Sequence, residues 1–223
     1  MSFPTVTART VSQDASDTNN HVVALPTHAV GDGILVCVSA YDPNFDFDDP
    51  VDWYVFDTTY SGDSRFVAKM LWKVAESASE TLTLTHTGSS YNDKWCWTVH
   101  VITPSSGMYM PYPTSTGSAA PDSSTNTNPP THTPPYGTQD YLWIVFRHFS
   151  STGAQATVAP ASFSNLQSDN NTAVCGCDSA ERSVNGSSLN PGAFTSPSST
   201  WAGSTTIAIH ETAIVGGFLG FFF

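Results

Sequence analysis

Basic residues are scarce in this chain of 223 residues, which has 7 Lys and Arg against 19 Asp and Glu. The net charge of −12 argues against binding to nucleic acid or to an anionic membrane, because both partners require a basic surface. Charged residues of both signs make up only 12% of the chain, so solubility rests mainly on hydroxyl and amide side chains. Such surfaces are common on proteins that work on virions or outside cells.

Helix-forming residues and catalytic motifs are also missing. Lys, Glu, Arg and Leu are few, whereas Ser, Thr, Gly and Pro are plentiful, which is the opposite of a helical composition. No nucleophile elbow, phosphate-binding loop or dinucleotide fingerprint is present. The few glutamates suggest no carboxylate pair for glycoside hydrolysis. We therefore expect an all-β protein that is not an enzyme.

Cysteines are too few for a disulfide framework in a chain of this length: Cys37, Cys96, Cys175 and Cys177. Cys175 and Cys177 lie two positions apart, so on a strand they point to the same face and are poorly placed to bridge each other. We expect buried free thiols, which fits folding in a reducing cytoplasm. The first residues lack the basic start and apolar stretch of a signal peptide, so export is not expected.

An acidic segment over residues 42–52 contains a weak candidate for a metal site. Asp42, Asn44 and Asp46 alternate as the first ligands of a calcium loop do. The pattern then fails, because Phe47 stands where the loop requires glycine and no glutamate follows at the twelfth position. The seven histidines are dispersed without metal-ligand spacing. A solvated acidic loop is the favoured interpretation, and no cofactor is expected.

Short apolar runs bounded by turn residues predict strands throughout the chain. In the first half they cover residues 5–12, 20–26, 33–41, 51–57, 65–75, 80–87 and 94–103, and in the second half residues 140–149, 163–168, 172–183, 193–196 and 204–212. Two stripes of alternating large residues, 66–72 and 95–101, are expected to belong to the core. The alternation of Thr and Leu over 81–86 is typical of a half-buried antiparallel strand.

The chain contains an internal repeat. Residues 31–39 are matched by residues 138–146 about 107 positions later, and residues 97–102 are matched by 205–210. We expect a single β-sandwich domain over residues 1–212, in which halves 20–103 and 138–212 share one core. Chance recurrence of generic strands is the alternative. Between the halves, residues 104–137 are rich in Pro, Ser and Thr and predict a long loop.

Two apolar segments are candidate interfaces. The tail 213–223 is too short to span a bilayer and would promote aggregation if nothing covered it. We expect it to be an arm that docks on a neighbouring subunit, the alternative being a last strand within its own domain. A second segment, residues 108–113, is expected either to form an interface or to pack on its own sheet edge. The candidate interface residues are Phe218, Leu219, Phe221, Phe222, Phe223, Met108, Tyr109, Met110 and Tyr112.

Both halves follow the same rhythm of acidic turn, apolar strand, aromatic-rich loop, second strand (72–75 or 182–184) and final Thr-rich strand. With segments 189–195 and 205–209, this rhythm resembles the jelly-roll-like β-sandwich structural proteins of tailed-bacteriophage virions. The resemblance covers most of residues 20–212, and it concerns strands and turns rather than catalytic residues. It implies a homotrimeric head decoration or cement protein, which bridges neighbouring subunits of the major capsid protein. The chain would then be located in the virion, after assembly in the host cytoplasm.

The same resemblance allows a second function, a carbohydrate-binding module of a tail fibre or appendage. Exposed aromatic residues would then be platforms for a glycan, with Trp53, Tyr54, Tyr91 and residues 109–112 as candidates. A polysaccharide-degrading enzyme is a more distant alternative, since it requires two carboxylates that converge in one cleft.

Overall fold

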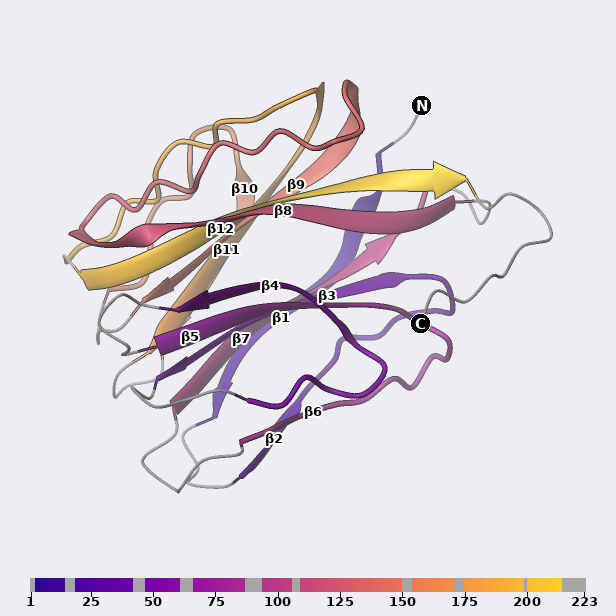
Figure 1. The fold of residues 1–223 in the computed structure, drawn as a ribbon, viewed down its shortest axis with the longest axis horizontal. Coiled ribbons are helices and arrows are strands. Elements are labelled where there is room, and N and C mark those ends of the chain that lie inside the picture. The colour runs from indigo at the N-terminus through magenta and orange to yellow at the C-terminus, as the bar shows by residue number, and fades with distance from the viewer. Residues whose placement is uncertain are drawn as a thin grey trace.

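In a computed structural model of the chain, the described residues are 3–14, 19–41, 47–60, 66–86, 94–105, 109–149, 154–170, 175–198 and 200–213. Within these ranges the chain forms twelve β-strands and no helix, which confirms the all-β prediction (Figure 1). All pairs of neighbouring strands are antiparallel.

The strands form two five-stranded sheets and one two-stranded sheet. The first sheet has the order β1-β7-β3-β5-β4 and contains β1 (Thr5–Asp14), β3 (Gly33–Tyr41), β4 (Tyr54–Tyr60), β5 (Phe66–Val74) and β7 (Lys94–Thr103). The second sheet has the order β10-β11-β9-β12-β8 and contains β8 (Tyr109–Ser124), β9 (Gln139–Phe149), β10 (Ser164–Asn170), β11 (Gly176–Gly186) and β12 (Thr200–Ala213). The small sheet pairs β2 (Asn20–Val23) with β6 (Leu82–Thr85).

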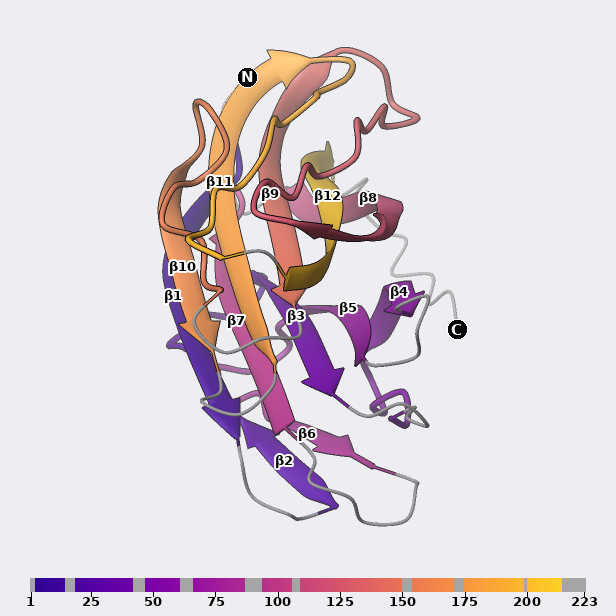
Figure 2. The ribbon, with the colours of Figure 1, turned by 90° about the vertical axis from the view of Figure 1, so that its left-hand side faces the viewer.

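The two large sheets pack face to face (Figures 1 and 2). Leu35, Met70 and Trp72 of the first sheet meet Ile144 and Ile207 of the second sheet in one buried cluster. The predicted antiparallel β-sandwich is therefore confirmed. Its connectivity differs from that of a jelly roll, in which the chain alternates between the two sheets. Here each large sheet is built from one contiguous half of the chain.

The two halves share one strand order. Without β2 and β6, each half has five strands. Numbered along the chain within each half, these strands have the spatial order 1-5-2-4-3 in both sheets. The edges are related in the same way, since β1 contacts β10 and β4 contacts β8. This arrangement is that of two similar units related by a pseudo-twofold axis, and it favours duplication over chance recurrence.

A turn repeated in both halves supports the duplication. The backbone N–H of Trp53 donates to the carbonyl of Pro50 at 3.2 Å, and that of Phe163 donates to the carbonyl of Pro160 at 3.0 Å. The third residue of each turn has a positive φ, 66° at Asp52 and 68° in the second turn. A positive φ at this position is the feature that defines a type II turn.

The predicted alignment of β7 with β12 is wrong by one residue. It matches Ile102 with His210, but Ile102 points toward the second sheet whereas His210 stacks on Tyr136 with ring centroids 4.1 Å apart. On β12 the residues that point between the sheets are Ile207 and Ile209. A shift of one residue reverses the face of every side chain on a strand, so the repeat needs an odd offset here.

The predicted loop over 104–137 is wrong over residues 109–124, which form β8, the longest strand described, whereas residues 125–137 form no strand, as predicted. β8 is an edge strand that pairs only with β12 in its sheet. Pro111, Pro113 and Pro121 made it resemble a loop, but proline is tolerated on a strand edge that needs no donor. The predicted strand 193–196 is reduced to a single bridge between Thr195 and Val158.

The outer face of each large sheet lies beneath a further layer. The first cover consists of β2, β6 and residues 47–53, and buries Phe47 and Leu84 against Trp95 of the first sheet. The second cover consists of residues 125–137, 154–163 and 187–198, and includes Phe194, packed against Val145 of the second sheet. The predicted core stripes thus lie on opposite faces of one sheet: 68–72 faces the sandwich and 95–99 faces the first cover.

Candidate functional site

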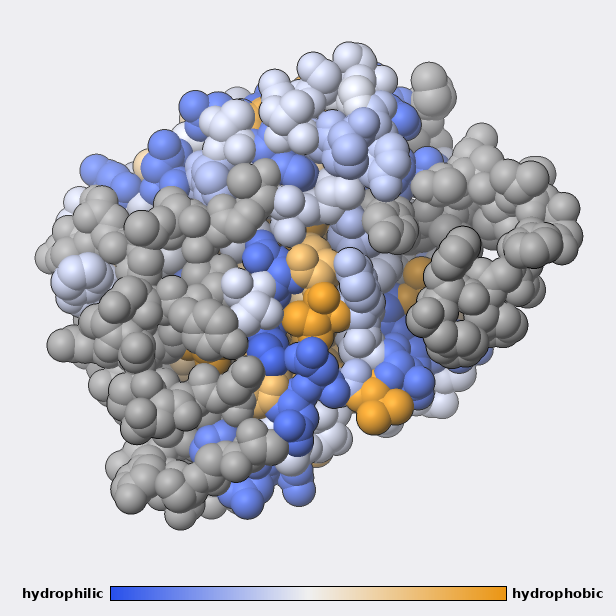
Figure 3. Space-filling model, viewed as in Figure 1, coloured by the Kyte–Doolittle hydropathy of each residue, from blue (hydrophilic) through white to orange (hydrophobic). Residues whose placement is uncertain are grey.

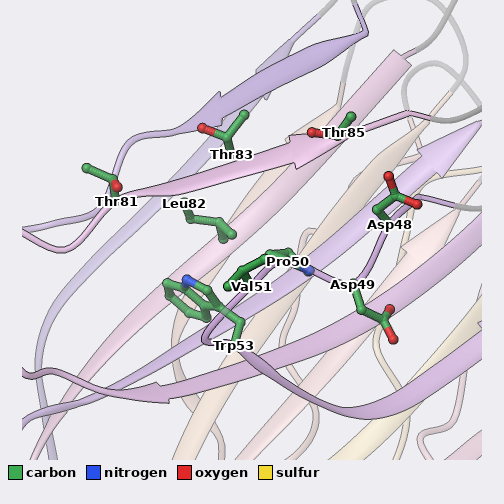
Figure 4. Close-up of a pocket in the computed structure, with 9 residues that line it drawn as sticks. All are labelled: Asp48, Asp49, Pro50, Val51, Trp53, Thr81, Leu82, Thr83 and Thr85. Atoms are coloured by element: carbon green, nitrogen blue, oxygen red, sulfur yellow. The ribbon is translucent and has the colours of Figure 1, made fainter.

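A depression of about 390 Å³ lies between β6 and the loop 47–53, within the first cover (Figure 4). Carboxylates, threonine hydroxyls, one indole and a few apolar groups line it. The lining residues are Asp48, Asp49, Pro50, Val51, Trp53, Thr81, Leu82, Thr83 and Thr85.

Strand β6 forms one wall through its alternating sequence. Leu82 and Leu84 are buried in the core of the first cover, whereas Thr83 on the other face of the strand is exposed. Thr81 is exposed as well, just before the strand begins. The predicted half-buried strand is confirmed. Thr81 and Thr83 line the depression along its β6 edge, with their side chains on the side of the strand opposite to Leu82, which points toward Trp53 (Figure 4).

The loop 47–49 forms the opposite wall and is held by a buried lysine. Lys69 donates through Nζ to the carbonyl of Phe47 at 2.6 Å and to Asp49 Oδ1 at 2.8 Å. The backbone N–H of Asp48 donates to the carbonyl of Thr85 at 3.1 Å, which joins the loop to β6. Asp49 therefore has a positive partner, while Asp48 carries its negative charge at the surface.

Trp53 belongs to the floor of this depression. It follows the Pro50 turn, and only 8% of its surface is exposed. Its indole nitrogen is on the edge of the ring that is nearer to β6 (Figure 4). Val51, which precedes it, is 86% exposed and forms an apolar rim. The sequence suggests Trp53 as an exposed platform for a glycan, but the structure buries most of this residue, which still lines the depression.

A serine, a histidine and a glutamate meet between the two sheets, in an arrangement that could suggest catalysis. His100 Nε2 lies 3.0 Å from Ser179 Oγ, and its Nδ1 lies 4.0 Å from Glu181 Oε2. His100 and Ser179 are completely buried, and Arg9 is bound to Glu181 at 2.5 Å. Burial, reinforced by the positive charge of Arg9, lowers the pKa of His100 to about 3. No substrate can reach this serine, so the cluster joins the sheets rather than catalysing a reaction.

Arg147 and Asp178 form a second buried polar cluster, beneath the second cover. Arg147 Nη1 lies 2.6 Å from Asp178 Oδ2, and both side chains are fully buried. The same nitrogen donates to the carbonyl of Ala154 at 2.9 Å, and Nε donates to Thr127 Oγ1 at 3.1 Å. The pair therefore fastens separate segments of the second cover to the sheet.

The four cysteines are free and buried, as the sequence predicts. Cys96 Sγ and Cys175 Sγ lie 3.7 Å apart. Burial raises the pKa of the thiols of Cys37, Cys175 and Cys177, which disfavours the reactive thiolate. These thiols serve as packing groups of the core.

Several predicted site residues lie outside the described residues: Asp42, Asn44, Asp46, Tyr91, Met108, Phe218, Leu219, Phe221, Phe222 and Phe223. Among the residues that are described, no group of three His, Cys, Asp or Glu side chains is placed to hold a metal ion. Tyr54 is described and 55% exposed on β4, where its ring stacks on Phe56.

The structure places Ala213, the first residue of the predicted arm, beside the other predicted interface segment. In the pairing of β8 with β12, Tyr109 lies opposite Ala213, Met110 opposite Thr212, and Tyr112 opposite His210. The apolar tail 214–223 follows directly after this last pair in the sequence. We name the paired residues 109–112 and 210–213 the β8–β12 corner.

Comparison with protein families, with curated proteins and with solved structures finds no match to this chain. The described part of the chain contains no helix long and apolar enough to cross a membrane.

Sequence reasoning missed the depression except for Trp53. The sequence predicts a solvated loop at Asp48 and Asp49 and an ordinary strand at residues 81–85. Some 30 positions separate the two segments, so nothing in the sequence indicates that they lie side by side. The tandem acids before Pro50 were a signal of a polar surface, but only the fold places them opposite the threonines of β6.

Proposed function

We propose that this chain is a structural protein of a bacteriophage virion, and specifically a head decoration protein that bridges neighbouring capsid subunits. The observation that supports this proposal is the β8–β12 corner. There, the segment beginning at Tyr109 lies beside Ala213, after which the sequence continues into the apolar tail. The described start of β8 and end of β12 thus lie side by side, and a partner that binds at this corner could also bind the tail that follows in the sequence.

The composition of the tail explains how such a contact would stabilise a shell. Each square ångström of apolar surface removed from water contributes roughly 25 cal/mol, so docking of several phenylalanines is strongly favourable. A contact that exists only in the assembled particle stabilises the assembled state. A homotrimer would repeat the contact three times through closed symmetry, which multiplies a weak attachment.

The described surface is compatible with this role. Its exposed large hydrophobic residues are scattered: Val22, Val30, Val51, Tyr54, Tyr136, Val158 and Trp201. Most of the residues that are coloured in Figure 3 are hydrophilic or neutral, and a few hydrophobic groups lie near the middle of this face. The net charge of −12 would limit adhesion between particles. The Ser179–His100–Glu181 cluster is sealed between the sheets, which favours a passive function over catalysis.

The test is attachment of tail variants to the virion of the phage that carries this gene. One variant lacks residues 218–223, and a second keeps the length but replaces Phe218, Phe221, Phe222 and Phe223 with serine. The matched control is Val22→Ser, which removes an exposed apolar side chain from the first cover. We expect both tail variants to fold with an unchanged unfolding temperature and to lose most of their virion occupancy, while the control keeps it.

Full occupancy of both tail variants would contradict the proposal. Failure of both to fold would show that the tail completes its own sandwich, and would also contradict an attachment arm. Quantitative mass spectrometry of the intact virion tests location, because a decoration protein is present in many copies and a tail appendage in few.

A further inference from the structure

We infer that the depression between β6 and the loop 47–53 binds a neutral sugar residue. This inference goes beyond the proposed structural role and does not depend on it. It rests on an indole donor, an exposed carboxylate, threonine residues and an apolar rim that line one depression (Figure 4).

The first observation is the unused hydrogen-bond donor of Trp53. Its indole N–H donates to no described residue, although only 8% of the residue's surface is exposed. The nitrogens of Trp97 and Trp143 also lack partners, but they are enclosed in the interior. Trp53 differs because it lines an open depression, where a ligand hydroxyl could accept its proton.

The second observation is the set of polar residues that line the same depression. Asp48 is exposed, and its carboxylate makes no hydrogen bond or ion pair with any described residue. A carboxylate accepts from two neighbouring hydroxyls at once, which suits the vicinal hydroxyls of a sugar. Thr81 and Thr83 line the β6 edge of the depression, and a threonine hydroxyl can either donate or accept.

The third observation is the size and apolar content of the depression. Its 390 Å³ falls near the lower end of the roughly 300–1,000 Å³ range of ligand pockets. This volume suits a short saccharide unit rather than a long groove-bound chain. Pro50 and Val51 offer carbon surface against which the C–H face of a sugar ring can pack.

Charge selects among sugars. Lys69 of β5 contacts this loop, and its Nζ is bound to Asp49 and to the Phe47 carbonyl. The depression therefore offers a negative carboxylate at Asp48, which would repel sialic and uronic acids. Neutral sugars are expected to bind in preference to acidic ones.

The second half provides an internal comparison at the corresponding place. The N–H of Val158 donates to the carbonyl of Thr195, as that of Asp48 does to Thr85, and the repeated turn follows in both halves. By this match, residues 48–53 (DDPVDW) correspond to residues 158–163 (VAPASF). The second half keeps the backbone but has neither the tandem carboxylates nor the indole, so the backbone alone does not require them.

The experiment uses the full chain labelled with ¹⁵N and follows the indole N–H signal of Trp53, which is assigned with the variant Trp53→Phe. The probes are the methyl glycosides of glucose, galactose and mannose, with methyl glucuronide as the acidic counterpart and Ca²⁺ alone as a cation control. We expect a saturable shift with at least one neutral glycoside, and at least about tenfold weaker binding of methyl glucuronide than of methyl glucoside if glucoside is the one bound.

The deciding variant is Asp48→Asn, with Asp52→Asn as the matched control. Both remove one negative charge from the same loop, but Asp52 does not line the depression. Loss of a charged acceptor should weaken binding by about tenfold in Asp48→Asn and leave Asp52→Asn unchanged.

Three results would overturn the inference. These are no shift with any neutral glycoside up to its solubility limit, a shift with Ca²⁺ alone, or equal binding by Asp48→Asn and the unmodified chain. If Trp53→Phe does not fold, backbone assignment identifies the signal and the Asp48 comparison still decides. The tail variants keep this depression, so failure here is distinguishable from failure of the virion proposal.

Discussion

The two covers bury the outer faces of their sheets with different structures. Each closes the outer face of a five-stranded sheet, and the two sheets have the same strand order. The first cover contains a pair of short strands, β2 and β6, which bury apolar side chains such as Val23, Leu82 and Leu84. In the second cover, an isolated bridge between His132 and Leu189 occupies the place of that strand pair. A shared sheet therefore does not dictate how its outer face is covered.

The difference is explained by the backbone polar groups of irregular segments. Strand pairing satisfies the N–H and C=O groups of the first cover, but loops must find other partners once they are buried. In the second cover, Arg147 donates to the carbonyl of Ala154, and Asp178 accepts from the N–H of Ala156 at 3.2 Å. In the second cover, the buried ion pair thus makes hydrogen bonds to the backbone that strand pairing makes in the first cover.

The largest expected effect is loss of the second cover's ion pair. We predict that Arg147→Met destabilises the protein by about 3–5 kcal/mol, because it leaves the Asp178 carboxylate buried without its cation. Urea unfolding followed by tryptophan fluorescence measures the change. The double variant Arg147→Met with Asp178→Leu should recover part of the loss, since no uncompensated charge remains. A single variant as stable as the unmodified chain would show that the pair does not hold the cover.

A smaller effect is expected from the buried cation of the first cover. We predict that Lys69→Met costs about 1–3 kcal/mol, because it removes the partner of the Phe47 carbonyl. The loss is smaller than at Arg147 because the Asp49 side chain is 67% exposed and can return to water. The same urea experiment applies, with Asp49→Asn as the control for the exposed half of the contact. A loss equal to that of Arg147→Met would remove the proposed contrast between the covers.

Much of the sandwich could be predicted because its strands are long apolar runs between turn residues. β3, β7 and β9 were located to within a residue or so for this reason. β8 was missed because Pro111 and Pro113 suggest a loop, and only its edge position makes them acceptable. The sequence does not predict the Arg147–Asp178 pair. Each residue is a single charge within a mostly apolar strand, and only the fold shows that the two side chains are in contact.

Acid should weaken the second cover through His132. Burial lowers the pKa of His132 to about 4, whereas the unfolded chain takes up this proton near pH 6.5. Between these values the unfolded state binds the proton and the folded state does not, so stability falls as the pH falls from 6.5 toward 4. We predict a loss of about 1–2 kcal/mol over this range that is reduced in His132→Gln. Unfolding curves at both pH values test this, and an identical pH dependence in His132→Gln would contradict it.

The smallest effect expected is at the repeated turns, and it tests how alike the halves are. Asp52 and Ser162 both have positive φ values, near 66° and 68°, which glycine adopts at lower cost. We predict that Ser162→Gly stabilises the chain by up to about 1 kcal/mol. Asp52→Gly should gain less, because aspartate tolerates this conformation better than serine does. Thermal unfolding of both variants, with Ser162→Ala as the control that retains the strain, measures these changes. Opposite signs for the two glycine variants would show that the turns share a shape without sharing its energetics.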